Sequence, residues 1–141
     1  MFERILVPVD LTEESLKAVD VAYDFATRFG AEVALLHVIE TVEHVQFEFE
    51  QLKPFYDRIE NSARRGLQEF SERFVSNNLS VDQAVVYGHR TQQIIDFAIR
   101  NRIDLIIMAS HRIDPDRPGH DWPSISYTVA ILSPVTMLLV K

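Results

Sequence analysis

The residues best suited to chemistry follow an apolar segment near the carboxyl-terminal end of the sequence. The apolar run from Asp104 to Ser110 leads into a stretch rich in proline, aspartate and arginine, which ends at Pro123 to Ser126. An apolar strand that ends in small residues and passes through a loop into a helix is how α/β proteins build phosphate sites. The usual glycine positions of such a loop hold other residues here. The sequence therefore predicts the strand-loop-helix order of a phosphate site, but without the glycines that usually form its loop.

The same stretch carries side chains that suit a metal ion or a nucleophile, but their spacing favours neither use. The metal-ligating types are His111, Asp114, Asp116, His120 and Asp121. No spacing typical of a metal site relates them, and such side chains in a proline-rich loop are usually solvated. Ser124 and Ser126 are better suited to cap a helix than to attack a substrate, because no base lies at motif spacing. We expect no catalytic residue and no metal ion.

Five apolar segments alternate with helical patterns along the chain. The expected strands span residues 4–9, 32–39, 81–87, 104–108 and 135–140, and the expected helices begin after Thr12, at Phe55, at Arg90 or Thr91, and at Ser124. Residues 40–53 are interpreted as a surface segment with at most one loose helical turn. This order predicts a single α/β domain over residues 1–141. Its fold is a doubly wound, Rossmann-like, five-stranded parallel sheet with helices on both faces.

The long second helix is predicted from an apolar stripe at spacings of four and three. The stripe comprises Phe55, Ile59, Ala63, Leu67, Phe70 and Phe74. Gly66 inside this helix costs about 1 kcal/mol relative to alanine, which suggests a close contact between helix and sheet. His37 lies in an apolar strand, and we interpret it as a hydrogen-bonded core histidine rather than a ligand.

A doubly wound sheet binds ligands past the carboxyl ends of its strands, where the strand order reverses. If the first and fourth strands flank this reversal, Pro8, Val9 and Asp10 face Met108, Ala109 and Ser110 across one crevice. The topology alone predicts this pairing.

Composition limits the partners and the compartment. The net charge of −7 argues against general binding to nucleic acid or to an acidic membrane, which needs a basic face. The absence of cysteine excludes disulfides, thiol catalysis and thiolate metal sites. No signal-peptide pattern and no apolar run of membrane-spanning length is present, so a cytoplasmic protein is expected.

Five short motifs in the expected order resemble the universal stress protein family. They are Ile-Leu-Val-Pro-Val-Asp ending at Asp10, Leu-Leu-His-Val ending at Val38, Gly88 before a helix with Ile94 and Ala98, Ile-Ile-Met-Ala-Ser-His ending at His111, and Ser-Pro-Val at 133–135. The resemblance covers the whole chain. It implies an adenine-nucleotide alpha-hydrolase-like fold and a homodimer through the last strand, Val135 to Val140. It also implies ATP or AMP binding in many members, without an established catalytic activity.

The resemblance also implies a set of nucleotide-binding residues. Asp10 and the backbone beside Val38 correspond to the adenosine contacts, although Asp10 is equally suited to cap the first helix. The remaining positions are Pro8, Val9, Met108, Ala109, Ser110, Arg112, Ser124, Ile125 and Ser126. Ala109, Arg112 and Pro123 stand where the family's phosphate loop has glycine. Glycine admits positive φ and a close approach of N–H groups to phosphate, so we expect ATP binding to be weakened or lost.

Three hypotheses follow from this degenerate loop. The first is a dimeric stress-response adaptor or regulator that acts by binding, with a second protein as partner. The alternative is a regulator that binds ATP or AMP, with magnesium, through phosphate contacts from Arg112 and Ser124. A remote alternative is an ATP hydrolase, for which no general base is found. Dimerisation is expected to fail in a Leu138→Pro variant, because a proline interrupts an edge strand.

Overall fold

The computed structural model describes residues 1–41, 49–110, 116 and 125–141 of the chain. The described residues form the elements β1 (Arg4–Pro8), α1 (Glu13–Phe29), β2 (Glu32–Ile39), α2 (Phe49–Ser76), β3 (Val81–Tyr87), α3 (Arg90–Arg100), β4 (Leu105–Ala109), α4 (Ile125–Leu132) and β5 (Thr136–Val140). β2 and β3 have the predicted bounds, β1 and β5 are one residue shorter at one end, and β4 is shifted by one residue. The predicted alternation of strands and helices is confirmed.

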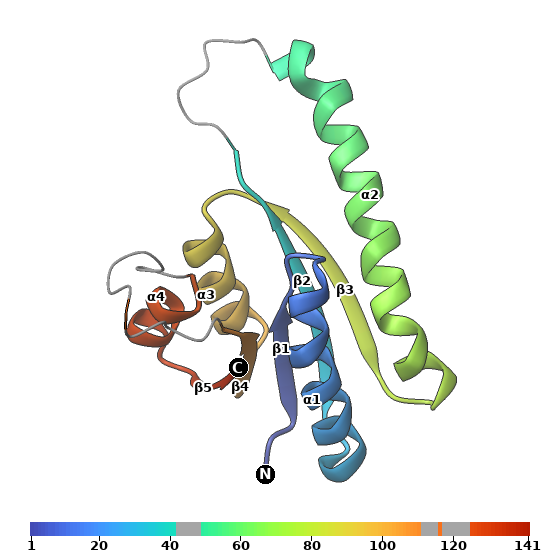
Figure 1. Ribbon diagram of the computed structural model, residues 1–141, viewed down its shortest axis with the longest axis vertical. Coiled ribbons are helices and arrows are strands. Elements are labelled where there is room, and N and C mark those ends of the chain that lie inside the picture. The colour runs from blue at the N-terminus through green and yellow to red at the C-terminus, as the bar shows by residue number, and fades with distance from the viewer. Residues whose placement is uncertain (42–48, 111–115, 117–124) are drawn as a thin grey trace.

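The five strands form one parallel sheet in the order β3-β2-β1-β4-β5 (Figure 1). The chain first moves outward from β1 to β3 and then crosses back to β4 and β5. The strand order therefore reverses between β1 and β4, which pair with Ile5 opposite Leu105. The predicted fold class is confirmed, and the crevice of a doubly wound sheet lies at the tips of these two strands.

Alternate residues of each strand face opposite sides of the sheet, and both sides of the inner strands β1, β2 and β4 are buried under helices. Ile5, Val7 and Leu35 pack with α1 and α2, whereas Leu6 and Leu36 pack with α3 and α4. Because both faces are covered, the strands are apolar at nearly every position. This continuous apolar character explains why the strands were recognisable in the sequence.

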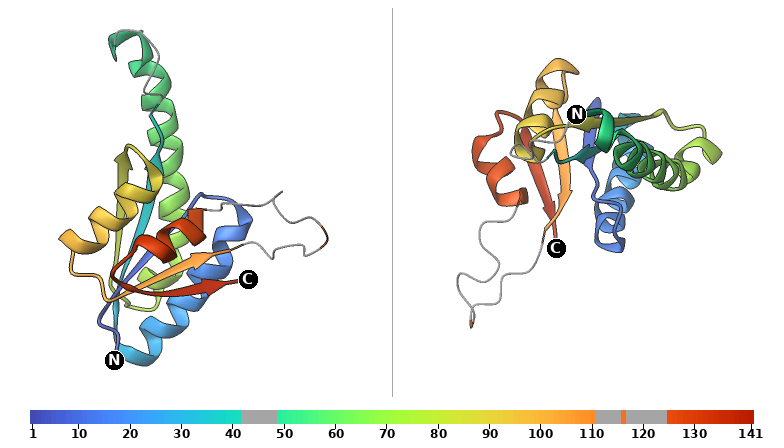
Figure 2. Two further views of the ribbon diagram at one scale, coloured as in Figure 1. Left: turned by 90° about the vertical axis from the view of Figure 1, so that its left-hand side faces the viewer. Right: turned by 90° about the horizontal axis from the view of Figure 1, so that it is seen from above.

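Helix α2 is longer than predicted and extends past the sheet. It begins at Phe49, five residues before Pro54, whereas the sequence placed its start at Phe55. The prediction was wrong because a proline usually lies in the first turn; here the helix continues through Pro54 and loses one backbone hydrogen bond. The amino-terminal half of α2 projects beyond the carboxyl ends of the strands (Figures 1 and 2). Phe55, predicted to face the core, is consequently 50% exposed.

Gly66 of α2 makes its close contact with a loop rather than with the sheet. A Cβ atom added at Gly66 would lie 3.1 Å from Cδ2 of Leu11, in the turn between β1 and α1. Leu11 has a φ of 66°, in the left-handed region that is costly for a branched side chain. The missing side chain of Gly66 thus leaves room for a strained leucine at the tip of β1.

Gly88, between β3 and α3, is expected to resist substitution. Its φ of 140° lies in a region that L-residues rarely adopt, and a Cβ atom there would lie 2.9 Å from Nε2 of Gln93. We expect Gly88→Ala to lower the free energy of unfolding by about 1–3 kcal/mol through backbone strain. Urea denaturation measures this change. A Gln92→Ala variant, at an exposed position of α3, serves as control. A Gly88→Ala protein as stable as wild type would contradict the prediction.

Candidate functional site

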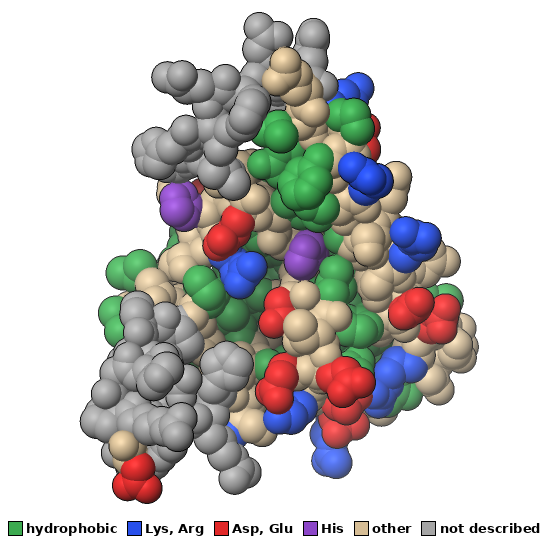
Figure 3. Space-filling view, turned by 45° about the horizontal axis from the view of Figure 1, so that its top comes forward, with side chains coloured by type: hydrophobic (Ala, Val, Ile, Leu, Met, Phe, Trp, Pro, Cys, Tyr) green, Lys and Arg blue, Asp and Glu red, His purple; other side chains and the backbone are tan. Residues whose placement is uncertain are grey.

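The crevice at the tips of β1 and β4 brings together residues from opposite ends of the chain. Pro8 ends β1, and Val9 and Asp10 follow it; Met108 and Ala109 end β4, and Ser110 follows. Val9, Met108 and Ser110 are buried, whereas Asp10 is exposed. Figure 3 views the molecule from this end, where charged side chains and histidines lie among hydrophobic ones. The structure thus has the adjacency of Pro8–Asp10 and Met108–Ser110 that the topology predicted.

The Asp10 carboxylate organises the turn that leads into α1. Its Oδ1 accepts hydrogen bonds from the Thr12 N–H (3.0 Å), the Thr12 hydroxyl (2.6 Å) and the Ser15 hydroxyl. The Asp10 N–H in turn donates to Ser15 Oγ at 3.0 Å. Thr12 is the N-cap residue by position, but its side chain makes no capping bond of its own. The hydrogen bonds to Asp10 therefore hold the turn at the start of α1, which favours its interpretation as a capping residue. Only one of its two carboxylate oxygens, Oδ1, takes part in these bonds.

The environment of Asp10 favours the charged carboxylate. Partial burial acts to raise its pKa, but the hydrogen bonds from Ser15 and Thr12 and the positive charge of Arg90 outweigh it. The pKa of Asp10 is consequently lower than its ordinary value of 3.8. Arg90 begins α3, and its Nε lies 3.9 Å from Oε1 of Glu40, past the end of β2. Among the described residues, the charges near Asp10 thus include a guanidinium that is itself beside a second carboxylate.

The peptide groups of Val38 face the crevice past the end of β1. The β1–β2 ladder ends with Pro8 opposite Leu36, and the last bond on this side runs from the Val9 N–H to the Leu36 carbonyl at 2.8 Å. Because alternate residues of a strand direct their peptide groups to the same side, Val38 follows Leu36 in facing the β1 side. Among the described residues, no backbone hydrogen bond reaches the Val38 N–H or carbonyl from that side.

His37 prevents the ladder from continuing to Val38. Its Nδ1 lies 2.8 Å from the Val9 carbonyl, the group that would otherwise accept the next ladder bond. A carbonyl only accepts, so Nδ1 carries the hydrogen in this contact. The prediction of a hydrogen-bonded histidine agrees with this contact. Val38 is itself buried, and its N–H and C=O face the β1 side without a backbone partner there among the described residues.

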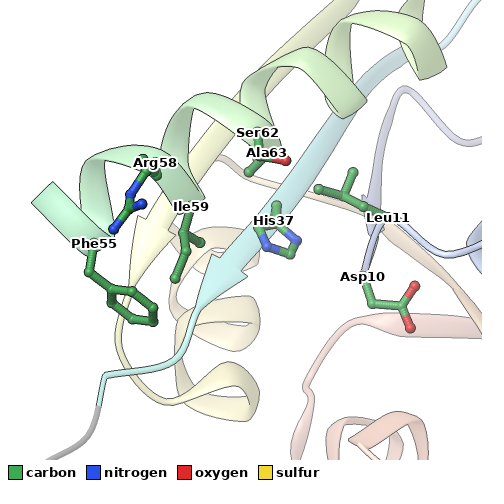
Figure 4. A pocket seen from close by; sticks show the side chains of 8 residues that line it. All are labelled: Asp10, Leu11, His37, Phe55, Arg58, Ile59, Ser62 and Ala63. Carbon is green, nitrogen blue, oxygen red and sulfur yellow. The ribbon is translucent and has the colours of Figure 1, made fainter.

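A cavity of about 540 Å³ opens beside the crevice, between β2 and the projecting half of α2 (Figure 4). It is lined by Asp10, Leu11, His37, Phe55, Arg58, Ile59, Ser62 and Ala63. Its walls are mostly apolar, with a few polar groups, as in many small-molecule pockets of this size. Asp10, at the tip of β1, is therefore a neighbour of both this side pocket and the crevice.

The family follows from a comparison with protein-family models. The model described as the universal stress protein family matches residues 1–141. The chain belongs to the universal stress protein family.

Individual universal stress proteins are similar to it over their full length. YxiE of Bacillus subtilis is 25% identical over 149 aligned residues, which cover 100% of both chains. The structure of UspA from Lactobacillus plantarum superposes with a TM-score of 0.85 at 21% identity, covering 99% of this chain and 98% of that one. A universal stress protein in complex with cAMP has a TM-score of 0.71 at 19% identity, covering 99% and 97%. These structures share the fold of this chain.

The site residues implied by the resemblance to universal stress proteins are only partly described. Arg112 and Ser124 lie outside the described residues, as do the candidate metal ligands at 111, 114, 120 and 121. Ser110 and Ser126 lie side by side, with Ser126 Oγ donating to Ser110 Oγ at 3.2 Å, and Ile125 begins α4 beside them. In the described part of the chain, no three His, Asp or Glu side chains are grouped as a metal site requires. No described helix is both long and apolar enough to cross a membrane.

Sequence reasoning missed most of the side pocket. Of the predicted site residues, only Asp10 lines it; Phe55, Ile59 and Ala63 were assigned to the core. Their spacing was interpreted correctly as one helix face. Toward the amino-terminal end of α2, where Phe55 lies, this face extends beyond the sheet and has no strand to cover. The length of the apolar stripe was the available signal, because it exceeds what strands of five to eight residues can cover.

Proposed function

We propose that this universal stress protein acts by binding an adenine nucleotide in the crevice at the tips of β1 and β4. Family membership supports a universal stress protein-like role, and a protein of the same fold is known in complex with cAMP. Proteins of this family are mostly nucleotide-binding proteins rather than enzymes. Binding that signals the state of the nucleotide pool, rather than catalysis, is therefore the proposed activity.

The peptide edge of Val38, which no described backbone group pairs on the β1 side, carries this proposal. A backbone N–H and a backbone C=O side by side complement N1 and the N6 amino group of adenine, which accept and donate in that order. Asp10, two residues past the end of β1, is placed to accept from ribose hydroxyls. The hydrogen bond between His37 and Val9 keeps the Val38 edge from pairing within the sheet. The base would then lie over the tip of β1, with the side pocket beside it.

The phosphate side of the crevice supports a monophosphate better than a triphosphate. Ala109 replaces the first glycine of the family's loop, and Arg112 and Pro123 replace the others by sequence. A proline lacks the N–H that a helix start would offer to phosphate. Fewer backbone donors are thus available for a polyphosphate chain, and we propose that ATP binds more weakly than AMP, with or without magnesium.

Calorimetric titration with adenosine, AMP, ATP and inosine tests this function, after removal of co-purified nucleotide. We expect AMP to bind in the micromolar to low millimolar range. Inosine should bind at least roughly tenfold more weakly than adenosine, because its N1–H and O6 reverse the pattern that Val38 presents and leave both peptide groups unpaired. No binding of adenosine or AMP at millimolar concentration would refute the proposal, and equal binding of inosine would refute the role of Val38. Phosphate release from ATP above background would revive the hydrolase alternative.

We also propose that the protein forms a homodimer through β5. Proteins of this family are commonly homodimers. β5 is an edge strand, paired only with β4 in the described sheet, and an edge strand presents unpaired peptide groups to a partner.

A further inference from the structure

A lysine lies at the end of β5, on that side of the crevice. Lys141 follows the last residue of β5, and its Nζ donates to Ser110 Oγ at 3.3 Å. Ser110 also accepts from Ser126 of α4, and the two serines are 5% and 4% exposed. The Lys141 ammonium lies 5.5 Å from the centre of the Tyr127 ring, within the range of a cation–π contact. Residues of β4, α4 and β5 thus hold one positive charge at the strand tips.

The backbone fixes where this charge lies. The Ser110 N–H donates to the Val140 carbonyl at 2.8 Å, which continues the β4–β5 ladder one residue past β4. The backbone of Lys141 therefore lies beside the tip of β4, and its side chain reaches back to Ser110. Adjacent strands are about 4.8 Å apart, so the tip of β5 lies roughly two strand spacings, about 10 Å, from the tip of β1. With the base at Val38 of β2 and the ribose at Asp10 past β1, as proposed above, the next strands in the sheet order on the far side of the ribose are β4 and β5, where a 5′ phosphate would lie.

We propose that Lys141, positioned by Ser110 and Tyr127, binds the phosphate of a nucleoside monophosphate in this crevice. The inference rests on the proposed nucleotide-binding function and assigns the phosphate contact to a residue of this chain outside the loop. A lysine ammonium binds phosphate as a point charge with three donors. It needs neither positive φ nor close approach of backbone, which are the properties that the loop lost with its glycines. One cation matches one phosphate group better than a triphosphate chain.

The test compares two ligands that differ only in the phosphate. Calorimetry gives the ratio of the adenosine Kd to the AMP Kd for wild type, Lys141→Gln, Lys141→Arg and Lys17→Gln. A hydrogen bond to a charged group corresponds to about a ten- to hundredfold change in Kd, so we expect AMP to bind wild type at least tenfold more tightly than adenosine. In Lys141→Gln this ratio should fall toward one while the adenosine Kd is unchanged. Lys141→Arg should keep most of the ratio, and Lys17→Gln, an exposed change of equal charge on α1, should keep all of it.

The possible outcomes separate this inference from the function on which it rests. A Lys141→Gln protein that retains the wild-type ratio, or a wild-type ratio near one, overturns the role of Lys141 and leaves adenosine binding intact. Failure of wild type to bind either ligand overturns the proposed function together with the inference. The preference for AMP should also decline in wild type between 50 and roughly 500 mM salt, since screening weakens a contact between charges. A preference that is independent of salt would overturn the assignment of a charged contact.

Discussion

Replacement of Asp10 with alanine is expected to abolish adenosine binding and to lower the free energy of unfolding by about 2 kcal/mol. The carboxylate accepts three hydrogen bonds, from the Thr12 N–H and from the hydroxyls of Thr12 and Ser15. Alanine leaves the start of α1 without this acceptor, and the buried Ser15 hydroxyl without its acceptor in this turn. It also removes the group placed to receive the ribose hydroxyls.

The two consequences of this substitution are separable by measurement. Urea denaturation reports the loss of stability, and calorimetry reports the loss of adenosine binding under conditions where the variant is folded. Asp24→Ala, an exposed aspartate on the same helix, is the matched control and should change neither quantity. A folded Asp10→Ala protein that binds adenosine as wild type does would refute the ribose contact. Unchanged stability would refute the capping role.

The charge of Asp10 gives its contribution a defined pH dependence. Its pKa is lowered in the folded protein, so the folded state binds its proton less readily than the unfolded state does. The stabilisation is therefore complete above the unfolded pKa of about 3.9, and it is lost as pH falls through the lower folded pKa. Asp10→Asn keeps an acceptor oxygen but lacks the charge. We expect the stability difference between wild type and Asp10→Asn to narrow between pH 6 and pH 3; a constant difference would show that the charge contributes nothing.

The fold could be predicted because its signals are local. β2 was bounded correctly because both of its faces are buried, which makes an uninterrupted apolar run after Gly30. Gly30 itself adopts the left-handed conformation expected of a residue that ends a helix, with a φ of 67°. The start of α2 was misplaced because Pro54 is a strong local signal that the helix overrides. Such an override depends on the contacts of the whole helix, which no short window contains.

The site was less predictable because it depends on contacts between distant residues. The backbone ladder between β1 and β2 stops short of Val38, where His37 bonds to Val9, 28 residues earlier in the chain. The sequence identified Val38 only through resemblance and identified His37 only as a core residue. In the sequence, Lys141 is a single charged residue after an apolar strand, and nothing distinguishes it from a solvated lysine. Its contact with Ser110 becomes apparent only from the β4–β5 register.

The direction of the peptide groups in β5 determines which proline substitution tests the dimer. The Val140 carbonyl accepts from the Ser110 N–H, so the peptide groups of Val140 and, two residues earlier, Leu138 face β4. Those of Leu139 face the open edge. The choice of Leu138→Pro made from the sequence was therefore wrong as a test of dimerisation: it removes a bond within the sheet. That substitution should cost about 1–3 kcal/mol, because it leaves a carbonyl of β4 without its donor, and so destabilise the monomer itself.

Leu139→Pro is expected to convert the dimer to a folded monomer. Proline is tolerated in an edge strand where its missing N–H faces outward, but it cannot donate to a strand added at that edge. Sedimentation velocity at micromolar concentration should show a dimer for wild type and for Leu139→Ala, which keeps the N–H and shortens the same side chain. Leu139→Pro should sediment as a monomer with an unchanged circular dichroism spectrum. A wild-type monomer would refute the dimer, whereas a dimeric Leu139→Pro protein would show that the interface does not depend on a ladder bond from the Leu139 N–H.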